Sequence, residues 1–260
     1  MKVDFTHRVY QNLISVLLEK NYLFVTMEKY FTSNFENTKI VLIRHDVDRL
    51  PGNALRLAQL ESQFNQKSTF YFRMIPSCYN ENIIKQIVDL GHELAYHYED
   101  LSLKKGDFYQ AIQSFESNLN KLRKFYPVST ICMHGSPISR WDNRDLWTRY
   151  NLNDFGLVGE PYLSLDFNEI FYLTDTGRKW NDESISIRDK VISSQIKYFN
   201  STFDVIQALN QEKLPNKLMF NIHPHRWHSN IILWFYELVF QNAKNLVKKR
   251  YYSSKLINDY

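Results

Sequence analysis

The stretch KIVLIRHDVD, residues 39–48, contains the pattern that decides the fold of this chain. It begins as a continuous apolar run and ends in charged residues. Runs of the same form recur along the chain, at 68–74, 92–99, 129–135, 154–160, 169–175 and 217–224. Segments with helical spacing separate them, and continuous apolar runs between amphipathic helices are typical of parallel strands covered on both faces. About seven such β-α units predict an α/β fold, an irregular (β/α) barrel of the TIM type, with a doubly wound open sheet as the alternative.

The domain organisation predicted for the 260 residues is a single domain spanning 1–260. No repeat, low-complexity tract or linker rich in Pro or Gly interrupts the chain. Residues 1 to about 38 are expected to form a helical extension, with one helix over 7–20. The segment IILWFYELVFQNAKNLVKKR is expected to close the chain as a long helix.

Composition and charge narrow the class of protein. The formal net charge of +4 is modest and does not require a nucleic-acid partner. Cys78 and Cys132 form no CxxC pair and no disulfide framework, which favours a reducing compartment. The N-terminus lacks the apolar region of a secretory signal, and no window has the roughly 18 apolar residues of a spanning helix. We therefore expect a cytoplasmic protein.

Polar residues stand where the apolar runs end. These residues are Asp46, Asp48, Arg73, His97, His134, Glu160, Asp175 and His223. The carboxyl ends of the strands of a parallel barrel meet at one mouth, where catalytic groups are held. The pattern therefore predicts a functional site made of histidines and carboxylates from several strands.

The alternation of side chains along a strand refines this prediction. In the first run Arg44, Asp46 and Asp48 share one face and point into the barrel, whereas His45 faces the surrounding helices. His92 and His97 are an odd number of residues apart and lie at opposite ends of one strand, roughly 16 Å from each other. We therefore assign His97 to the site.

Two carboxylates beside an imidazole suit a divalent ion, most simply Zn²⁺, which takes oxygen and nitrogen ligands and keeps one position open for water. Such an ion lowers the pKa of its bound water and polarises a carbonyl group. A carboxylate that does not bind the metal is then available as general base, and a histidine opposite as general acid.

Several motifs resemble those of a known family. RHDVD, STFYF, GHELAYHYEDL, ICMHGSPISRWDNRDLW, FYLTDTGRKW and NIHPHRW, between about 40 and 228, resemble the polysaccharide deacetylases with NodB homology, carbohydrate esterase family 4. The likeness is to a cytoplasmic branch with HDVD, associated with surface-polysaccharide biosynthesis. The resemblance implies a distorted (β/α) barrel and metal-assisted removal of an N-acyl group from a sugar. It implies Asp46 as general base, Asp48 and His97 as metal ligands, and His223 as general acid.

This chain departs from the family pattern at three places. Val47 separates two aspartates that are usually adjacent, and Leu101 occupies the position of the usual second metal histidine. The fourth run has His134 where the third motif ordinarily has an arginine. We expect His134 to complete the ligand set with Asp48 and His97. The alternative is a damaged site that binds metal weakly or not at all.

Two functions are therefore open. The first is hydrolysis of an acetyl or formyl group from an N-acylated amino sugar, carried by a nucleotide or a lipid. The second is a catalytically impaired protein that binds a sugar or a lipid intermediate on the same fold. Residues expected to shape the sugar pocket, for which a structural role is equally compatible, are Arg44, Arg73, Glu160, Asp175, Arg178 and Trp180.

The basic segment KNLVKKRYYSSK near the C-terminus raises one further expectation, peripheral contact with anionic lipid headgroups. Basic residues near a helix C-terminus are also explained by the helix dipole.

Overall fold

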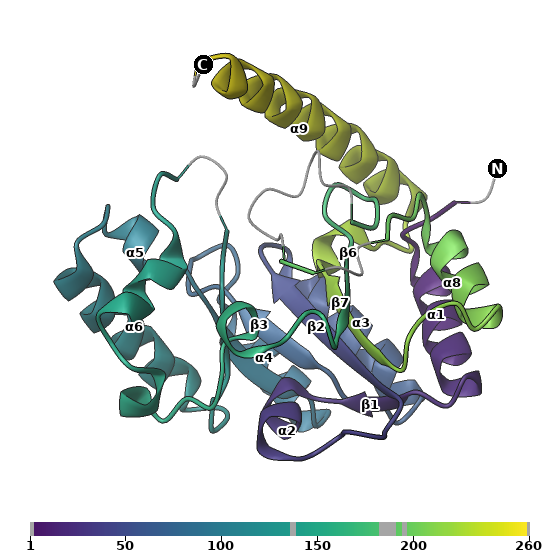
Figure 1. Ribbon diagram of the computed structural model, residues 1–260, viewed down its shortest axis with the longest axis horizontal. Coiled ribbons are helices and arrows are strands. Elements are labelled where there is room, and N and C mark those ends of the chain that lie inside the picture. The colour runs from purple at the N-terminus through teal and green to yellow at the C-terminus, as the bar shows by residue number, and fades with distance from the viewer. Residues whose placement is uncertain (1–2, 136–138, 182–190, 194–196, 259–260) are drawn as a thin grey trace.

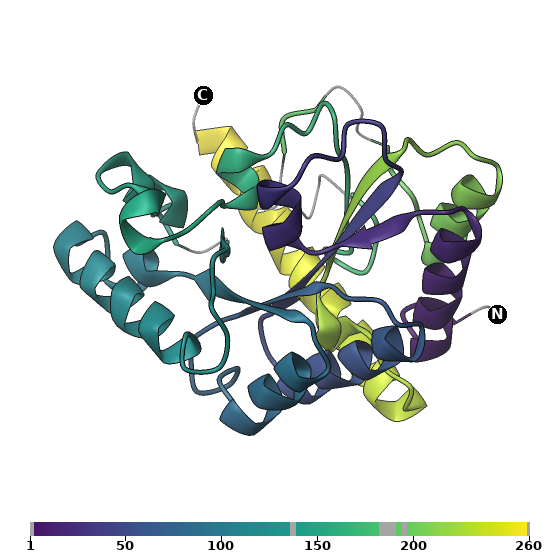
Figure 2. The ribbon, with the colours of Figure 1, turned by 90° about the horizontal axis from the view of Figure 1, so that it is seen from below.

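The computed structural model describes residues 3–135, 139–181, 191–193 and 197–258, with side chains up to residue 246. Its centre is one sheet in which every strand pairing is parallel. The strands follow the order β5-β4-β3-β2-β7-β6, with β1 paired to β2. Their bounds are β1 (Leu23–Val25), β2 (Ile40–Val47), β3 (Thr69–Phe72), β4 (Glu93–Tyr98), β5 (Ile131–Met133), β6 (Phe171–Thr174) and β7 (Lys217–Ile222). The sheet is curled into an incomplete barrel (Figures 1 and 2), which confirms the predicted fold class.

Strand β2 occupies the middle of this sheet. It pairs with β7 on one edge, and on the other edge with β1 near Ile40 and with β3 near Arg44. All eight of its residues are buried. Neighbours on both edges and packing on both faces explain why its sequence is an apolar run rather than an alternating one.

Helices cover the outside of the sheet (Figures 1 and 2). Val41 and Ile43 face an outer core together with residues of α1 and α8, whereas Leu42 packs inside the barrel with Tyr71 and Met219. The longer helices are α1 (His7–Glu19), α3 (Pro51–Gln63), α4 (Glu81–Asp89), α6 (Phe108–Leu122), α8 (Thr202–Asn210) and α9 (Ile231–Asn258). Short helices are α2 (Met27–Thr32), α5 (Asp100–Leu103) and α7 (Pro161–Ser164), with 3-10 turns at Asn143–Thr148, Leu152–Phe155 and Pro224–Arg226.

Two elements differ from the sequence-based prediction. The stretch 23–25, expected to be part of a helical extension, is strand β1, because it pairs with the edge of β2 that β3 leaves open. The run 154–160 is not a strand and makes only an isolated bridge between Thr130 and Gly159. Gly156 turns the chain at a φ of 64°, and Pro161 begins a helix soon after, so no ladder extends here.

The long C-terminal helix is confirmed as α9, which runs diagonally across one end of the barrel (Figures 1 and 2). In the part of the chain that the structure describes, we find no helix with the length and hydrophobicity needed to cross a bilayer.

Candidate active site

Four side chains meet at the mouth formed by the carboxyl ends of the strands, and we call them the mouth cluster: Asp48, His97, His134 and His223. Asp48 follows β2 directly, His97 lies near the end of β4, and His134 and His223 follow β5 and β7. The sheet therefore brings together residues that are far apart in the sequence, as predicted from the polar residues at the ends of the apolar runs.

The carboxylate of Asp48 is the centre of this cluster. The Nε2 atoms of His97 and His134 lie 3.5 and 3.6 Å from its Oδ1, and Nε2 of His223 lies 3.8 Å from its Oδ2. Within the described residues, Oδ1 is buried and accepts no hydrogen bond. The side chain of Asp48 is 20% exposed, so the cluster is reached from the mouth.

The other ring nitrogen of each histidine is held by an acceptor. Nδ1 of His97 lies 3.0 Å from the carbonyl oxygen of Cys132, Nδ1 of His134 lies 3.0 Å from Glu99, and Nδ1 of His223 lies 2.7 Å from Asp175. A carbonyl or ionised carboxylate oxygen only accepts, so Nδ1 of His97 and Nδ1 of His134 donate, whereas Nδ1 of His223 also lies 2.8 Å from Nη1 of Arg226, which can only donate. In the neutral imidazoles of His97 and His134, Nε2 then directs a lone pair toward the carboxylate of Asp48.

Lone pairs that face one another need a cation between them, either a proton or a metal ion. Burial would raise the pKa of Asp48, but contact with His97 and the charges of His134 and His223 hold that pKa well below its usual range. Burial alone would lower the pKa of His97, whereas Asp46 and Asp48 raise it. The cluster therefore attracts positive charge, as a metal site does.

The donor set has the chemistry of a zinc site, with one carboxylate and imidazoles whose second nitrogens are anchored. As the side chains stand, no group of three or more His, Cys, Asp or Glu among the described residues could hold a metal ion. The separations of 3.5 to 3.8 Å are wider than the roughly 3.4 Å between neighbouring ligands of tetrahedral zinc. A bound ion would have to draw these side chains together.

Asp46 differs from Asp48 because both of its oxygens are occupied. Nε and Nη2 of Arg44 donate to Oδ1 and Oδ2 of Asp46 at 2.7 and 2.5 Å, and both side chains are almost fully buried. Burial would raise the pKa of Asp46, but Arg44 and then His97 lower that pKa to about 2. Asp46 is thus kept ionised beside the mouth cluster, 3.8 Å from Nε2 of His97.

Glu99 is a site residue that the sequence reasoning did not include. Its carboxylate accepts from Nε and Nη2 of Arg73 at 2.8 and 2.7 Å, and it holds His134 through Nδ1. Burial would raise its pKa, whereas His134 and Arg73 lower that pKa to about 2. Its place could have been inferred from the sequence, because Glu99 is two residues after His97 and directly follows β4, so the strand alternation continued by one residue points it the same way.

Asp175 and Arg73, which were predicted to contact the sugar, instead support histidines of the mouth cluster. Asp175 is fully buried, holds Nδ1 of His223 and accepts from Nε1 of Trp227 at 3.0 Å. Burial would raise the pKa of Asp175, but Arg226 and His223 lower it. Arg73 acts through Glu99, although its own side chain remains 17% exposed.

The other predicted sugar contacts lie in buried positions. Trp180 is fully buried in the outer core and donates from Nε1 to Thr202 at 3.1 Å. Glu160 is also fully buried and caps α7, accepting from the backbone N–H of Leu163. These two side chains present no accessible surface to a sugar in this structure.

Two predicted sugar contacts are arginines held by other parts of the protein. Arg44 has no accessible surface and is bound to Asp46. Arg178 is almost buried, lies over the rings of Phe5 and Trp234, and donates to the carbonyl oxygen of Arg226.

A second group of buried polar residues lies on the outer side of the sheet, and we call it the outer cluster: Tyr10, His45, Glu61, Ser68 and His92. Nε2 of His45 lies 2.7 Å from Glu61, which also accepts from the Tyr10 and Ser68 hydroxyl groups. His92 accepts at Nδ1 from the backbone of Ser68, and its Nε2 lies 3.0 Å from the carbonyl oxygen of Ala58. His45 and His92 are therefore packing residues, as the strand alternation predicted.

Leu101, at which the motif resemblance implies that a second metal histidine is missing, is buried with Tyr98 in the apolar core behind β4. The mouth has His134 instead.

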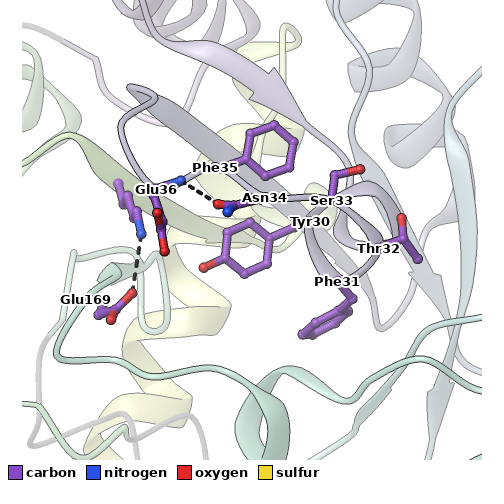
Figure 3. Close-up of a pocket in the computed structure, with 9 residues that line it drawn as sticks. Tyr30, Phe31, Thr32, Ser33, Asn34, Phe35, Glu36 and Glu169 are labelled. Atoms are coloured by element: carbon purple, nitrogen blue, oxygen red, sulfur yellow. Dashed lines mark hydrogen bonds and ion pairs between the residues drawn. The ribbon is translucent and has the colours of Figure 1, made fainter.

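An open hollow of about 490 Å³ lies away from the mouth, beside α2 and the first residue of β7 (Figure 3). Its lining includes Tyr30, Phe35 and Lys217, and Lys217 belongs to the amino end of the sheet, opposite the mouth cluster.

Comparison with known proteins finds similarity only at the level of solved structures. No protein-family model matches the chain, and no curated protein sequence does. The catalytic domain of a peptidoglycan N-acetylglucosamine deacetylase from Eubacterium rectale is similar at 17% identity and a TM-score of 0.46, over 82% of this chain and 88% of that one. A CE4 esterase from Streptococcus mutans is similar at 14% identity and a TM-score of 0.45, over 94% of this chain and 87% of that one.

A CE4 family pseudoenzyme from Bacillus anthracis is similar at 13% identity and a TM-score of 0.44, over 81% of this chain. This chain spans 63% of the length of that pseudoenzyme. At such identities and TM-scores, the roles of individual residues rest on the geometry of this chain alone.

Proposed function

We propose that this protein is a metal-dependent hydrolase that removes an acetyl or formyl group from the nitrogen of an amino sugar. The observation that carries the proposal is the mouth cluster, in which the anchored imidazoles of His97 and His134 direct Nε2 at Oδ1 of Asp48 and His223 faces Oδ2. Among the described residues, Oδ1 accepts no hydrogen bond. Two nitrogen lone pairs that converge on an anion form an arrangement that a divalent cation stabilises. The substrate class is an N-acylated sugar precursor of surface polysaccharide, carried by a nucleotide or a lipid.

Asp48, His97 and His134 are the proposed ligands of the ion, with zinc as the expected metal. When bound, such an ion supplies Lewis acidity for the amide carbonyl and lowers the pKa of water. Asp48 suits this role better than Asp46, because Arg44 already occupies both oxygens of Asp46. Glu99 fixes the ring of His134, and Arg73 fixes Glu99.

Asp46 is the proposed general base. It accepts a proton from the water that attacks the amide carbon, and its ionised state is secured by Arg44. The same contact makes it a weak base, because a pKa of about 2 limits its affinity for the proton. The charge of Arg44 thus fixes the position of this carboxylate at the expense of its basicity.

His223 is the proposed general acid. Its Nδ1 is held by Asp175, and its Nε2 faces the mouth. As the C–N bond breaks, Nε2 gives its proton to the amine nitrogen, and the acyl group leaves as acetate or formate. Asp175 is a positioning residue in this scheme, since it acts through His223.

The test is to measure the zinc content of the purified protein together with release of acetate or formate from N-acylated amino sugars. Diffraction at the zinc absorption edge should locate one ion beside Asp48, and Asp46→Asn should abolish hydrolysis while the ion remains bound. Retention of hydrolysis by Asp46→Asn would refute the proposed base.

A second candidate is a non-catalytic protein that binds a sugar or a lipid intermediate. The observation in its favour is that the described side chains, as they stand, could not hold a metal ion. Leu101 in place of a histidine points the same way. Purified protein that binds an N-acylated sugar but takes up no zinc and releases no acyl group would favour this candidate over the hydrolase.

A further inference from the structure

Helix α9 has its polar and apolar faces the opposite way round from an ordinary surface helix. Up to residue 246, where its side chains are described, the residues that it buries form one stripe at helical spacing, Trp234, Glu237, Gln241 and Asn245, of which three are polar. The large side chains that it exposes are apolar: Ile231, Ile232, Leu233, Phe235, Tyr236, Val239, Phe240 and Leu246. A helix on a water-facing surface normally buries its apolar face and exposes its polar one.

The polar face is firmly attached. Glu237 binds Nη2 of Arg49 at 2.5 Å, and Nδ2 of Asn245 donates to the carbonyl oxygen of Gly177 at 3.1 Å. Nε1 of Trp234 donates to the carbonyl oxygen of Asp4 at 2.6 Å. These contacts leave exposed the residues that we call the outward face, Ile232, Phe235, Tyr236 and Val239. Phe240 flanks this face, and the guanidinium of Arg49 lies 5.1 Å from the centre of its ring.

The charges along this helix are almost all positive. In the sequence 231–258 the basic residues are Lys244, Lys248, Lys249, Arg250 and Lys255, and the acidic residue is Glu237. Glu237 is buried and paired with Arg49, so it adds no negative charge to the outward face. Lys244 lies 4.4 Å from the centre of the Phe240 ring, next to the outward face.

We propose that α9 docks this protein on the surface of an anionic lipid bilayer. The outward face enters the level of the headgroups, and the excess of basic residues in this part of the sequence attracts the anionic lipids. Buried apolar area and attraction to anionic lipids are the two contributions that hold an interfacial helix on a bilayer. Complementary charge selects a bilayer with anionic lipids over a neutral one.

The contacts that hold α9 lie close to the mouth cluster. Arg49, which binds α9, is the residue after Asp48, and Gly177, which also binds α9, is two residues after Asp175. A docked α9 therefore brings the rim of the mouth close to the bilayer. A docked protein could then receive a lipid-linked sugar at the mouth, a consequence that rests on the function proposed above. The docking of α9 does not depend on that function.

The test uses the full chain and co-sedimentation with phosphatidylcholine vesicles that contain or lack phosphatidylserine. We expect binding to the anionic vesicles, decreasing as salt is added. The paired variant Ile232→Glu/Tyr236→Glu should weaken this binding about tenfold or more. Lys244→Glu should weaken it several-fold.

The matched control is Leu103→Glu/Tyr109→Glu, which adds the same charge at exposed apolar positions on α5 and α6. Tyr109 and Tyr236 are 67% and 68% exposed. This control should bind vesicles as the unmodified protein does, and thermal melting should show both paired variants folded.

Three results would overturn the proposal. The first is no binding of the unmodified protein to anionic vesicles, and the second is equal binding by the paired variant and its control. The third is a dimer in sedimentation equilibrium that Ile232→Glu/Tyr236→Glu dissociates, without vesicle binding, which would assign the outward face to a second copy of the chain. None of these measurements depends on hydrolysis, so the failure of docking and that of the proposed enzyme remain distinguishable.

Discussion

The mouth cluster and the outer cluster are built from the same kinds of side chain, histidines around one carboxylate. In the outer cluster both oxygens of Glu61 accept hydrogen bonds, and both ring nitrogens of His92 have partners. In the mouth cluster Oδ1 of Asp48 accepts no hydrogen bond among the described residues, and the imidazoles stand 3.5 to 3.8 Å from its carboxylate.

The difference teaches that residue type does not distinguish a binding site from a packing cluster. The outer cluster has used the hydrogen-bonding capacity of its carboxylate within the protein. Nδ1 of His45 makes no hydrogen bond among the described residues, but it is buried and no ligand reaches it. The mouth cluster keeps lone pairs unused and 20% of the Asp48 side chain exposed. Unsatisfied groups at an accessible position mark a functional site more reliably than histidines do.

The largest effect is expected from Asp48→Asn. The amide replaces an anionic ligand, so zinc binding should be lost and amide hydrolysis should fall about 10³-fold or more, because several kcal/mol of transition-state stabilisation disappear. Zinc content and the rate of acyl release measure this. A variant that keeps both would show that the mouth cluster is not the proposed site.

The matched change in the outer cluster is Glu61→Gln. It removes the buried partner of His45 and should lower the free energy of unfolding by about 3 kcal/mol. Zinc content per folded molecule should not change, because the outer cluster lies on the other side of the sheet. Urea unfolding with metal analysis measures both, and loss of zinc by the folded variant would contradict the distinction between the two clusters.

Glu93 is a third kind of buried carboxylate. Its oxygens accept from the hydroxyl groups of Thr69 and Thr130 and from the backbone N–H of Glu28. The groups that donate these hydrogen bonds to it are uncharged. Burial raises its pKa to about 7, against the lowering effect of these hydrogen bonds.

The folded state therefore binds the Glu93 proton more tightly than the unfolded state does. The stabilisation is fully present below about pH 4.5 and is lost as the pH rises through about 7, which amounts to roughly 2 kcal/mol between pH 5 and pH 8. Glu93→Gln should remove this part of the pH dependence of unfolding. The same slope in the variant and in the unmodified protein would mean that Glu93 is charged when folded.

The smallest effect is expected from Glu99→Gln. The ring of His134 keeps a weaker acceptor at Nδ1, so zinc affinity and hydrolysis should each fall about tenfold. A zinc titration by competition with a chelator measures the first. A change as large as that of Asp48→Asn would identify Glu99 as a ligand rather than a positioning residue.

The sequence predicted much of the fold and the centre of the site. Six of the seven apolar runs contain strands, and strand alternation correctly separated His45 and His92 from the mouth. It did not predict β1, a three-residue strand that depends on an open edge of β2. It also assigned Trp180 to the sugar pocket, although that residue is fully buried.

The sequence by itself determined which residues point into the barrel mouth, because side-chain direction along a strand is a local property with a period of two. Tertiary structure decided which aspartate keeps an unused oxygen, which carboxylate holds each imidazole, and which face of α9 meets the protein. Those outcomes depend on contacts of about 3 Å between residues from different strands and helices. Such contacts arise only after the sheet has curled and brought its carboxyl ends together.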